Sequence, residues 1–249
     1  MSDVVKVSWS GGKDSTCAVM LHIERGDKVK AVCYIPMFTE EIPLISKNHY
    51  EFILNTAERF RSLGAEVHIV SGMTYWDFCH KRSSRGKYKG RPFGFPCVCA
   101  GKCGFQRESK TKAVKSFDVG NFDYQDIGIA ADEVRRKKQL TTNLRSILVE
   151  MEYTEKMAWD FCIERNLLSP HYKHAHRDGC ALCPNAKKQE RNRWFSDFSE
   201  AVPLVIELQE FVRKELPGRY PLRNHEWFID TDQVTFFDEE SEEWNNDAR

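Results

Sequence analysis

The residues with the clearest chemical potential lie at positions 10–15, which read Ser-Gly-Gly-Lys-Asp-Ser. An apolar run containing Val4, Val5 and Val7 precedes them, and a segment with helical apolar spacing begins at Asp14. The hexapeptide is therefore predicted to join a buried strand to a helix. Adjacent glycines let backbone N–H groups approach an anion closely, and the N-terminus of the following helix adds a partial positive charge. This arrangement predicts a phosphate-binding loop.

The residues of this loop differ in their expected roles. Lys13 supplies a point charge, and Asp14 stands where it can place a metal ion or cap the helix. The adjacent glycines exclude the G-x-x-x-x-G-K-[ST] pattern of P-loop nucleotidases. The alternative is an ordinary strand-to-helix turn in which Asp14 or Ser15 is the N-cap. The expected phosphate contacts are Ser10, Gly11, Gly12, Ser15 and Thr16.

The hexapeptide resembles the PP-loop of the ATP pyrophosphatases in the adenine nucleotide alpha-hydrolase-like superfamily. In that family the loop grips the β/γ pyrophosphate while a nucleophile attacks the α-phosphate. Further segments are similar to those of phosphoadenosine phosphosulfate (PAPS) reductase-like proteins: DIGIAADEVRRKK at 126–138, the stretch 146–172, and GCALCP at 179–184. Together these resemblances cover most of residues 4–190.

The resemblance implies an enzyme that binds ATP and Mg²⁺, releases pyrophosphate and adenylates a substrate oxygen. Sulfur or nitrogen transfer to a nucleobase or a small metabolite is the expected next step. One alternative is a PAPS/APS reductase, but such enzymes use a late cysteine and this chain has none after Cys183. Another alternative is a non-catalytic subunit that senses nucleotides or binds nucleic acid.

Other site residues are expected where the strands of a parallel sheet end, because ligands bind beyond those carboxyl ends. Tyr34 is expected near the adenine, and Gly128 near the ribose and phosphates. Asp132 and Glu133 follow as nucleotide or Mg²⁺ contacts, or as charges that complement a helix dipole. Arg136 joins Lys13 and Asp14 as a catalytic candidate.

Two groups of cysteines suggest a metal site in a reducing compartment. Cys99 and Cys103 form one group and Cys180 and Cys183 the other, and a C-x-x-C followed by proline makes a turn that lets two thiolates share an ion. We expect structural Zn²⁺, with a 4Fe–4S cluster as the alternative that the family suggests. Cys97 is an alternative ligand to Cys99 or Cys103. The remaining cysteines fit apolar patterns and are expected in the core: Cys17, Cys33, Cys79 and Cys162.

Three histidines and a basic stretch complete the candidates. His171, His174 and His176 precede the second cysteine group and are expected in an exposed loop, or as a replacement for one thiolate. Residues 81–115 contain eleven Lys/Arg and one acid, Glu108. This stretch predicts either a solvated loop or an anion-binding rim for a small-molecule or nucleic-acid substrate.

The elements that position these residues alternate between strand and helix. Strands are expected at 4–9, 29–37, 66–70, near 126 and at 146–151, and helices at 14–25, 46–63, 106–117, 154–165 and 185–215. This order predicts an α/β fold with an open, mostly parallel five-stranded sheet flanked by helices (Rossmann-like PP-loop fold), a C-terminal helical lobe and a cysteine metal site. The expected division is a nucleotide-binding domain at 1–180 and a helical extension and tail at 181–249, packed as one unit.

Composition narrows the class of protein. The 249 residues carry 37 Lys+Arg and 37 Asp+Glu, so overall charge favours neither nucleic acid nor membrane. No apolar run is long enough to span a bilayer, and no secretory signal is visible. The expectation is a cytoplasmic protein without a membrane partner. A homo-oligomer and a complex with a sulfur-donor protein are the two assemblies considered.

Overall fold

A five-stranded parallel sheet forms the centre of the structure, a computed structural model that describes residues 2–99, 102–175, 179–222 and 225–230. Its strands are β1 (Val4–Trp9), β2 (Lys28–Tyr34), β3 (Glu66–Val70), β6 (Tyr124–Ile127) and β7 (Leu144–Arg145). Their order is β3-β2-β1-β6-β7, and every neighbouring pair is parallel. The predicted α/β fold with an open parallel sheet is confirmed.

The central strand β1 is rich in β-branched residues, which favour a buried strand. Val5 and Val7 are fully buried, and β1 pairs with β2 on one side and β6 on the other. The chain moves outward from β1 through β2 to β3, then crosses to the other side for β6. The strand order therefore reverses between β1 and β6, and such a switch point is where open parallel sheets bind ligands.

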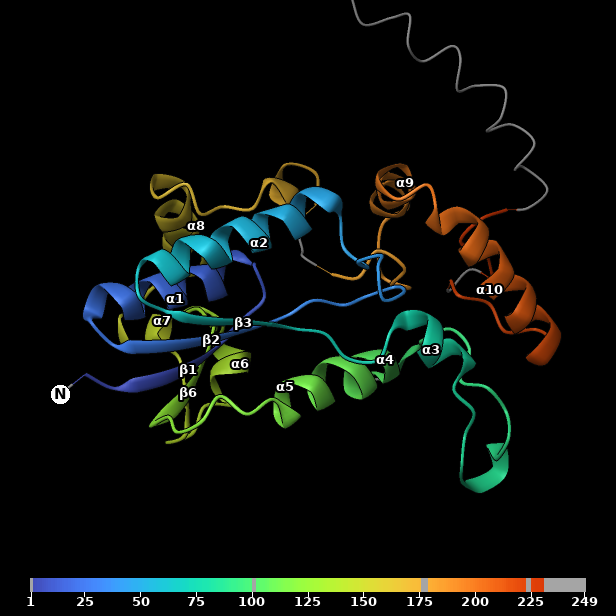
Figure 1. Ribbon diagram of the computed structural model, residues 1–249, viewed down its shortest axis with the longest axis horizontal. Helices are drawn as coiled ribbons and strands as arrows, with labels where there is room; N and C mark the ends of the chain where they lie inside the picture. The colour runs from blue at the N-terminus through green and yellow to red at the C-terminus, as the bar shows by residue number, and fades with distance from the viewer. Residues whose placement is uncertain (1, 100–101, 176–178, 223–224, 231–249) are drawn as a thin grey trace, which may run out of the picture.

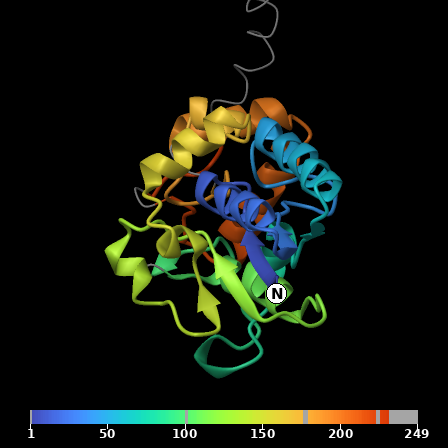
Figure 2. The same cartoon turned by 90° about the vertical axis from the view of Figure 1, so that its left-hand side faces the viewer.

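Helices cover both faces of the sheet (Figure 1 and Figure 2). One face carries the largest apolar cluster and is covered by α1 (Lys13–Arg25), α2 (Lys47–Ser62), α7 (Ile147–Glu150) and α8 (Glu155–Glu164). The other face is covered by α5 (Lys112–Ser116), whose residues pack on a smaller cluster containing Val32 and Val70. The predicted helices at 14–25, 46–63 and 154–165 are confirmed within one or two residues of their ends.

A second apolar cluster lies beyond the carboxyl ends of the strands, where α9 (Lys188–Asp197) and α10 (Ala201–Glu215) pack with α3 (Tyr75–His80). The cluster joins residues from both sides of position 180. Trp194, for example, is fully buried and donates its indole N–H to the Pro43 carbonyl at 2.9 Å. The division at 180 stays a prediction.

Three predicted elements differ from the structure. The single helix predicted at 185–215 is two helices, α9 and α10, because the backbone leaves the helical conformation at Phe198. Residues 146–151 do not form a strand: β7 ends at Arg145 and α7 begins at Ile147, whose N–H is accepted by the Asp126 carboxylate at 2.6 Å. That bond caps a helix, which the apolar run alone did not indicate. The helix predicted at 106–117 is broken by a π-helical stretch. The remaining elements are α4 (Gly104–Gln106), η2 (Arg107–Thr111), α6 (Val134–Lys137), η1 (Gly86–Tyr88), η3 (Pro170–Lys173), β4 (Val98–Cys99) and β5 (Lys102–Cys103).

Across the described ranges, the helices are all too short or too polar to traverse a lipid bilayer.

Candidate functional site

The predicted phosphate loop lies at the switch point of the sheet. It leaves β1 at Trp9, turns through Gly11 and Gly12, and enters α1 at Lys13. Because α1 has thirteen residues, its N-terminus is a site where anions are favoured. The structure therefore places the loop where the sequence predicted it.

Gly11 must be glycine for two independent reasons. Its φ of +77° lies in the left-handed region, which L-residues with a side chain adopt at a cost. A Cβ there would also lie 2.6 Å from Ile53 and 2.9 Å from the ring of His49, both on α2. The backbone of the loop is thus pressed against α2.

A network of hydroxyl groups fixes the shape of the loop. The Ser15 hydroxyl accepts from the Ser10 N–H and donates to the Gly12 carbonyl, both at 3.1 Å, and the Ser10 and Ser15 hydroxyls are 3.1 Å apart. Thr16 differs from these residues. It is fully buried and its hydroxyl accepts from the Trp9 indole at 2.9 Å, so it supports the loop from behind.

Lys13 is held among carboxylates. Its ammonium lies 2.9 and 2.8 Å from the two oxygens of Asp14 and 3.2 Å from Glu155, at the start of α8. Burial lowers the pKa of Lys13, but hydrogen bonds and charge from Asp14 and Glu155 outweigh it, and the pKa is raised. Lys13 is therefore a fixed positive charge at neutral pH.

The pKa of Asp14 is also raised, but for Asp14 burial contributes to the rise. Burial raises its pKa, the Lys13 ion pair lowers it, and the charges of Glu155 and Glu133 raise it again, so that the pKa ends above its usual value. Asp14 thus faces two like charges and one opposite charge. This excess of negative charge favours the arrival of a cation.

The strand end after β6 closes the other side of the loop. A Cβ on Gly128 would lie 2.6 Å from the Ser15 N atom, so the backbone of this strand end passes directly against the first turn of α1. Beyond it, the Asp132 carboxylate accepts from the Glu155 N–H at 3.0 Å. Glu133 is bound by Arg136 at 2.8 and 2.9 Å. The structure brings these predicted residues to one region.

Two further residues of this region were not predicted from the sequence. Tyr172, on η3, accepts a hydrogen bond from the Lys13 N–H at 3.2 Å and so occupies one donor of the helix N-terminus. Glu155 bonds the Lys13 ammonium from 142 residues away. Glu155 opens a predicted helix and Tyr172 lies in a loop, and neither position carries a local signal of contact with the phosphate loop.

Tyr34 lies in a different environment from the one predicted. It is buried at the end of β2, and its hydroxyl donates to the Ser109 hydroxyl at 2.7 Å. Burial raises the pKa of Tyr34, which keeps it a neutral phenol. Its bond to η2 anchors the broken helix to the sheet, and a contact with adenine stays a prediction.

The described cysteines divide as the sequence suggested. Cys17, Cys33, Cys79 and Cys162 are buried, as predicted. Cys103, Cys180 and Cys183 are partly buried. Cys103 and Cys180 pack against the apolar cluster that contains Tyr75, whose pKa is raised by burial. Cys97 is exposed, with the Arg219 guanidinium 3.9 Å from its sulfur.

The metal site itself stays a prediction. The side chain of Cys99 and all of His176 lie outside the described residues. Among the described side chains, no three His, Cys, Asp or Glu are placed as the ligands of one ion. This result covers three of the four predicted ligands, Cys103, Cys180 and Cys183.

A cavity of about 760 Å³ lies between the start of α2, η3 and α9. His171 and Ser46 line it and are joined by a 2.9 Å contact between Nδ1 and the hydroxyl. The ring of His171 also lies 5.4 Å from that of His49, the residue that packs on Gly11. His174 lines the same cavity and is exposed.

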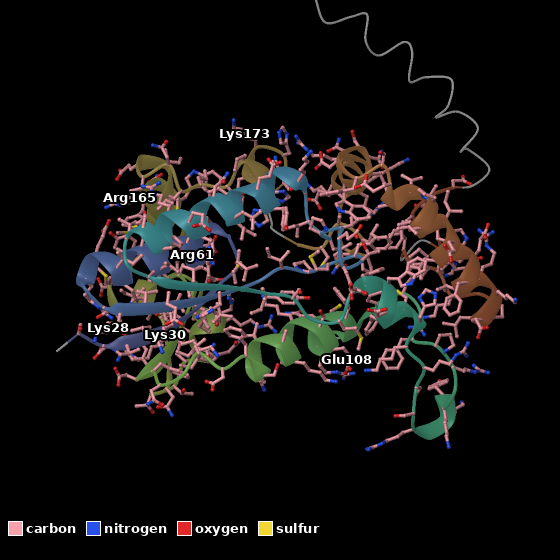
Figure 3. All side chains as sticks on the ribbon, viewed as in Figure 1. Lys28, Lys30, Arg61, Glu108, Arg165 and Lys173 are labelled. Carbon is pink, nitrogen blue, oxygen red and sulfur yellow. The ribbon has the colours of Figure 1, made fainter. Side chains whose placement is uncertain are left out.

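The basic stretch 81–115 separates into two parts. Near α5, the Glu108 carboxylate lies 2.8 Å from both Lys81 and Lys112 (Figure 3). Hydrogen bonds from Lys112 and Lys81 lower the pKa of Glu108 to about 2, so its carboxylate stays ionised and offsets part of the positive charge of these lysines. The part at 82–91 contains no carboxylate.

Comparison with known proteins adds no family assignment. No protein-family model matches the chain, and no curated protein matches its sequence.

Proposed function

We propose that this protein is an ATP pyrophosphatase of the PP-loop type, which adenylates an oxygen of an acceptor. The acceptor oxygen attacks the α-phosphorus of ATP, the bond from that phosphorus to the α,β-bridging oxygen breaks, and pyrophosphate leaves. A sulfur or nitrogen nucleophile then displaces AMP from the activated carbon. Both steps conserve atoms and need no oxidant or reductant.

The main support for this proposal is the position of the loop at residues 10–15. Gly11 and Gly12 lie at the switch point of a parallel sheet, directly before a long helix, and Gly11 has a conformation and a contact that exclude a side chain. Such a backbone can wrap a diphosphate, which stabilises negative charge on the leaving pyrophosphate. Lys13 adds a positive charge beside it.

The carboxylates around Lys13 support the use of Mg²⁺. Asp14 and Glu155 both contact the Lys13 ammonium, and the pKa of Asp14 is raised by burial and further by the charges of Glu155 and Glu133. When bound, Mg²⁺ neutralises charge on the phosphates and on these acids. Asp132 orients the start of α8 through its bond to the Glu155 N–H. Arg136 lies 2.8 Å from Glu133 and is the second cation that we assign to a phosphate.

We assign a structural role to the cysteine groups. Cys99, Cys103, Cys180 and Cys183 would hold Zn²⁺, or alternatively a 4Fe–4S cluster, and join the segment before α4 to the segment before α9. The packing of Cys103 and Cys180 against one apolar cluster is compatible with this role. Elemental analysis of protein purified without oxygen, with an absorption spectrum, distinguishes the two: absorbance near ~400 nm indicates the cluster.

The experiment that tests the function measures AMP and pyrophosphate. Protein, ATP and Mg²⁺ are incubated with a hydrosulfide donor and an acceptor pool of RNA or of small metabolites. Equal amounts of AMP and pyrophosphate are expected, and Lys13→Ala should abolish them while Lys28→Ala, at the far end of the sheet, should not. Sulfite production from PAPS with a thiol, without ATP cleavage, would instead identify a sulfonucleotide reductase. Binding of ATP without cleavage by any pool would favour a nucleotide sensor.

A further inference from the structure

Residues 82–91, here named the basic arm, project from the body of the molecule. The arm follows α3 and turns at η1, and it extends away from the other elements in both views (Figure 1 and Figure 2). Because β3 leads through a short connection into α3, the arm leaves on the side of the carboxyl ends of the strands. That is the side on which the phosphate loop lies.

The base of the arm is fixed by backbone hydrogen bonds. The Ser83 N–H donates to the Arg91 carbonyl, and the Gly90 N–H to the Ser83 carbonyl, both at 2.8 Å. One step nearer the body, the Phe93 N–H donates to the Lys81 carbonyl at the same distance. These bonds make a short hairpin, so the side chains at its tip are held outward.

Side chains and one glycine attach this hairpin to the body. Phe93 packs edge-to-face on Phe78 of α3 at 5.3 Å. Arg82 lies 3.1 Å from Glu215 at the end of α10. Gly94 has a φ of +64°, and a Cβ there would lie 2.6 Å from Leu216. The arm is therefore a positioned projection rather than a loose connection.

The arm carries unbalanced positive charge. Five of its ten residues are Lys or Arg and none is Asp or Glu. Arg82 is used at the base, but the other four are exposed, and within the described part of the chain no carboxylate pairs with them: Arg85, Lys87, Lys89 and Arg91. By contrast, Lys81 and Lys112 share an ion pair with Glu108. Charge without internal partners requires a partner from outside or water.

An aromatic side chain stands among these charges. Tyr88 is 58% exposed, which is unusual for so large an apolar surface, and it lies between Lys87 and Lys89 in sequence. The Lys87 ammonium lies 5.9 Å from the centre of the Tyr88 ring. An exposed ring flanked by cations matches the way in which proteins stack an unpaired base and hold the phosphates on either side.

We propose that the basic arm binds single-stranded nucleic acid, with Tyr88 stacked on an unpaired base and Arg85, Lys87 and Lys89 on the flanking phosphates. This inference deepens the proposed function and rests on it in one respect: it makes a nucleic acid the acceptor. A base within a duplex is stacked and paired, so a carbonyl oxygen can reach an enzyme site only when the base is unpaired.

The test measures binding of fluorescein-labelled 20-mers by anisotropy at several salt concentrations, without ATP. The probes are a mixed-sequence RNA strand, the same sequence as DNA, and a DNA duplex. The variant R85Q/K87Q/K89Q is compared with K28Q/K47Q/K188Q, which removes the same charge from exposed lysines that have no ion pair among the described residues. Lys28 lies at the opposite end of the molecule from the arm (Figure 3).

We expect wild type to bind single strands more tightly than the duplex. Loss of three phosphate contacts should reduce the slope of log K against log[salt] by about 2, whereas the control triple variant should keep the slope of the wild type. Tyr88→Ala should weaken single-strand binding about tenfold and leave the salt slope unchanged.

Three results would overturn the proposal: equal binding by the two triple variants, tighter binding to duplex than to single strands, or binding only to vesicles of anionic lipid. Unfolding curves of each variant exclude misfolding as the cause. Lys13→Ala should bind the probes as wild type does. Failure of the proposed ATP chemistry would thus leave arm binding intact, and failure of arm binding would leave ATP cleavage with a small acceptor intact.

Discussion

The two ends of helix α1 both carry clusters of charged side chains, but the clusters differ in burial and in how they are satisfied. At the N-terminus, the side chains of Lys13 and Asp14 are 14% and 22% exposed and Glu155 is 52% exposed. At the C-terminus, His22 and Asp126 are both fully buried. The same helix thus presents one cluster that a ligand can enter and one that is closed.

The closed cluster joins three elements of the fold. The two ring nitrogens of His22 lie 2.8 Å from Asp27 and 3.2 Å from Asp126. Asp126 also accepts from the Ile147 N–H at the start of α7, and Arg25 donates to the Tyr124 hydroxyl at 2.7 Å. These contacts fasten the end of α1 to β6 and α7. They have no access for a ligand, and we assign them to stability.

The open cluster differs in its balance of charge. The Lys13 ammonium contacts two carboxylates, Asp14 and Glu155, and the pKa of Asp14 is raised by burial and by its acidic neighbours. Among the described contacts, the Lys13 N–H is bound only by the hydroxyl of Tyr172. Imbalance of this kind is tolerated where binding supplies the missing charge. The two ends should therefore respond differently to mutation. Changes at the C-terminus of α1 should alter stability, and changes at its N-terminus should alter activity.

The largest expected effect comes from the closed end. Asp126→Ala leaves the Ile147 N–H and the His22 ring without their buried partner, so the free energy of unfolding should fall by about 3–5 kcal/mol. Urea unfolding measures this change. Asp160→Ala is the matched control, because Asp160 belongs to an exposed pair with Lys156 and should cost no more than about 0.5 kcal/mol. A loss below about 1 kcal/mol for Asp126→Ala would show that the closed cluster is not a major support.

The open end should show the reverse pattern. Lys13→Ala removes a charge placed beside the phosphates, so the rate of ATP cleavage should fall about a hundredfold or more. The free energy of unfolding should change by less than about 1 kcal/mol, because the side chain is partly exposed and its partners repel one another. Steady-state kinetics and urea unfolding on the same preparation give both numbers. A stability loss as large as that of Asp126→Ala would remove the distinction between the two ends.

The sequence identified one of these clusters and not the other for a physical reason. The phosphate loop is contiguous, so residues 10–16 were predicted from local spacing alone. The closed cluster depends on Asp126 meeting His22, and the contacts of Lys13 with Glu155 and Tyr172 also join distant segments. Such pairs form only once the strand order and the packing of α8 on α1 are known.

The same reasoning explains why the strand predicted at 146–151 is wrong. Its apolar residues, Ile147 and Leu148, are fully buried, as a strand would require. What makes the segment helical is the Asp126 carboxylate, which caps it from another strand. The parallel sheet was predictable because β-branched runs and helical segments alternate along the chain, whereas a cap supplied from elsewhere in the fold leaves no local pattern.

A smaller effect should appear in the pH dependence of the closed cluster. Burial raises the pKa of Asp27, but hydrogen bonds from His22 and Arg25 outweigh it, and the pKa is lowered. A lowered pKa means that Asp27 stabilises the fold above its unfolded pKa of about 3.9 and loses this contribution as the pH falls through the folded value. The stability difference between wild type and Asp27→Asn should therefore be constant from pH 5 to 7 and shrink as the pH falls below about 3.9. A difference that grew toward acid pH would contradict the assignment.

The smallest effect is expected at Tyr172, which contacts the N-terminus of α1. Its hydroxyl accepts from the Lys13 N–H, which lies at the N-terminus of α1, next to the glycines that the proposed function assigns to the diphosphate. If the hydroxyl and the phosphate compete, Tyr172→Phe should bind ATP about threefold more tightly, since one hydrogen bond contributes about 0.5–1.5 kcal/mol. The ring still packs near Trp159 at 5.3 Å, so stability should change little. Isothermal titration with ATP and Mg²⁺ measures the affinity, and Trp159→Phe is a control that alters the packing but keeps the hydroxyl. Weaker binding by Tyr172→Phe would mean that the hydroxyl donates to the nucleotide, and Tyr172 would then belong with Lys13 among the residues that hold it.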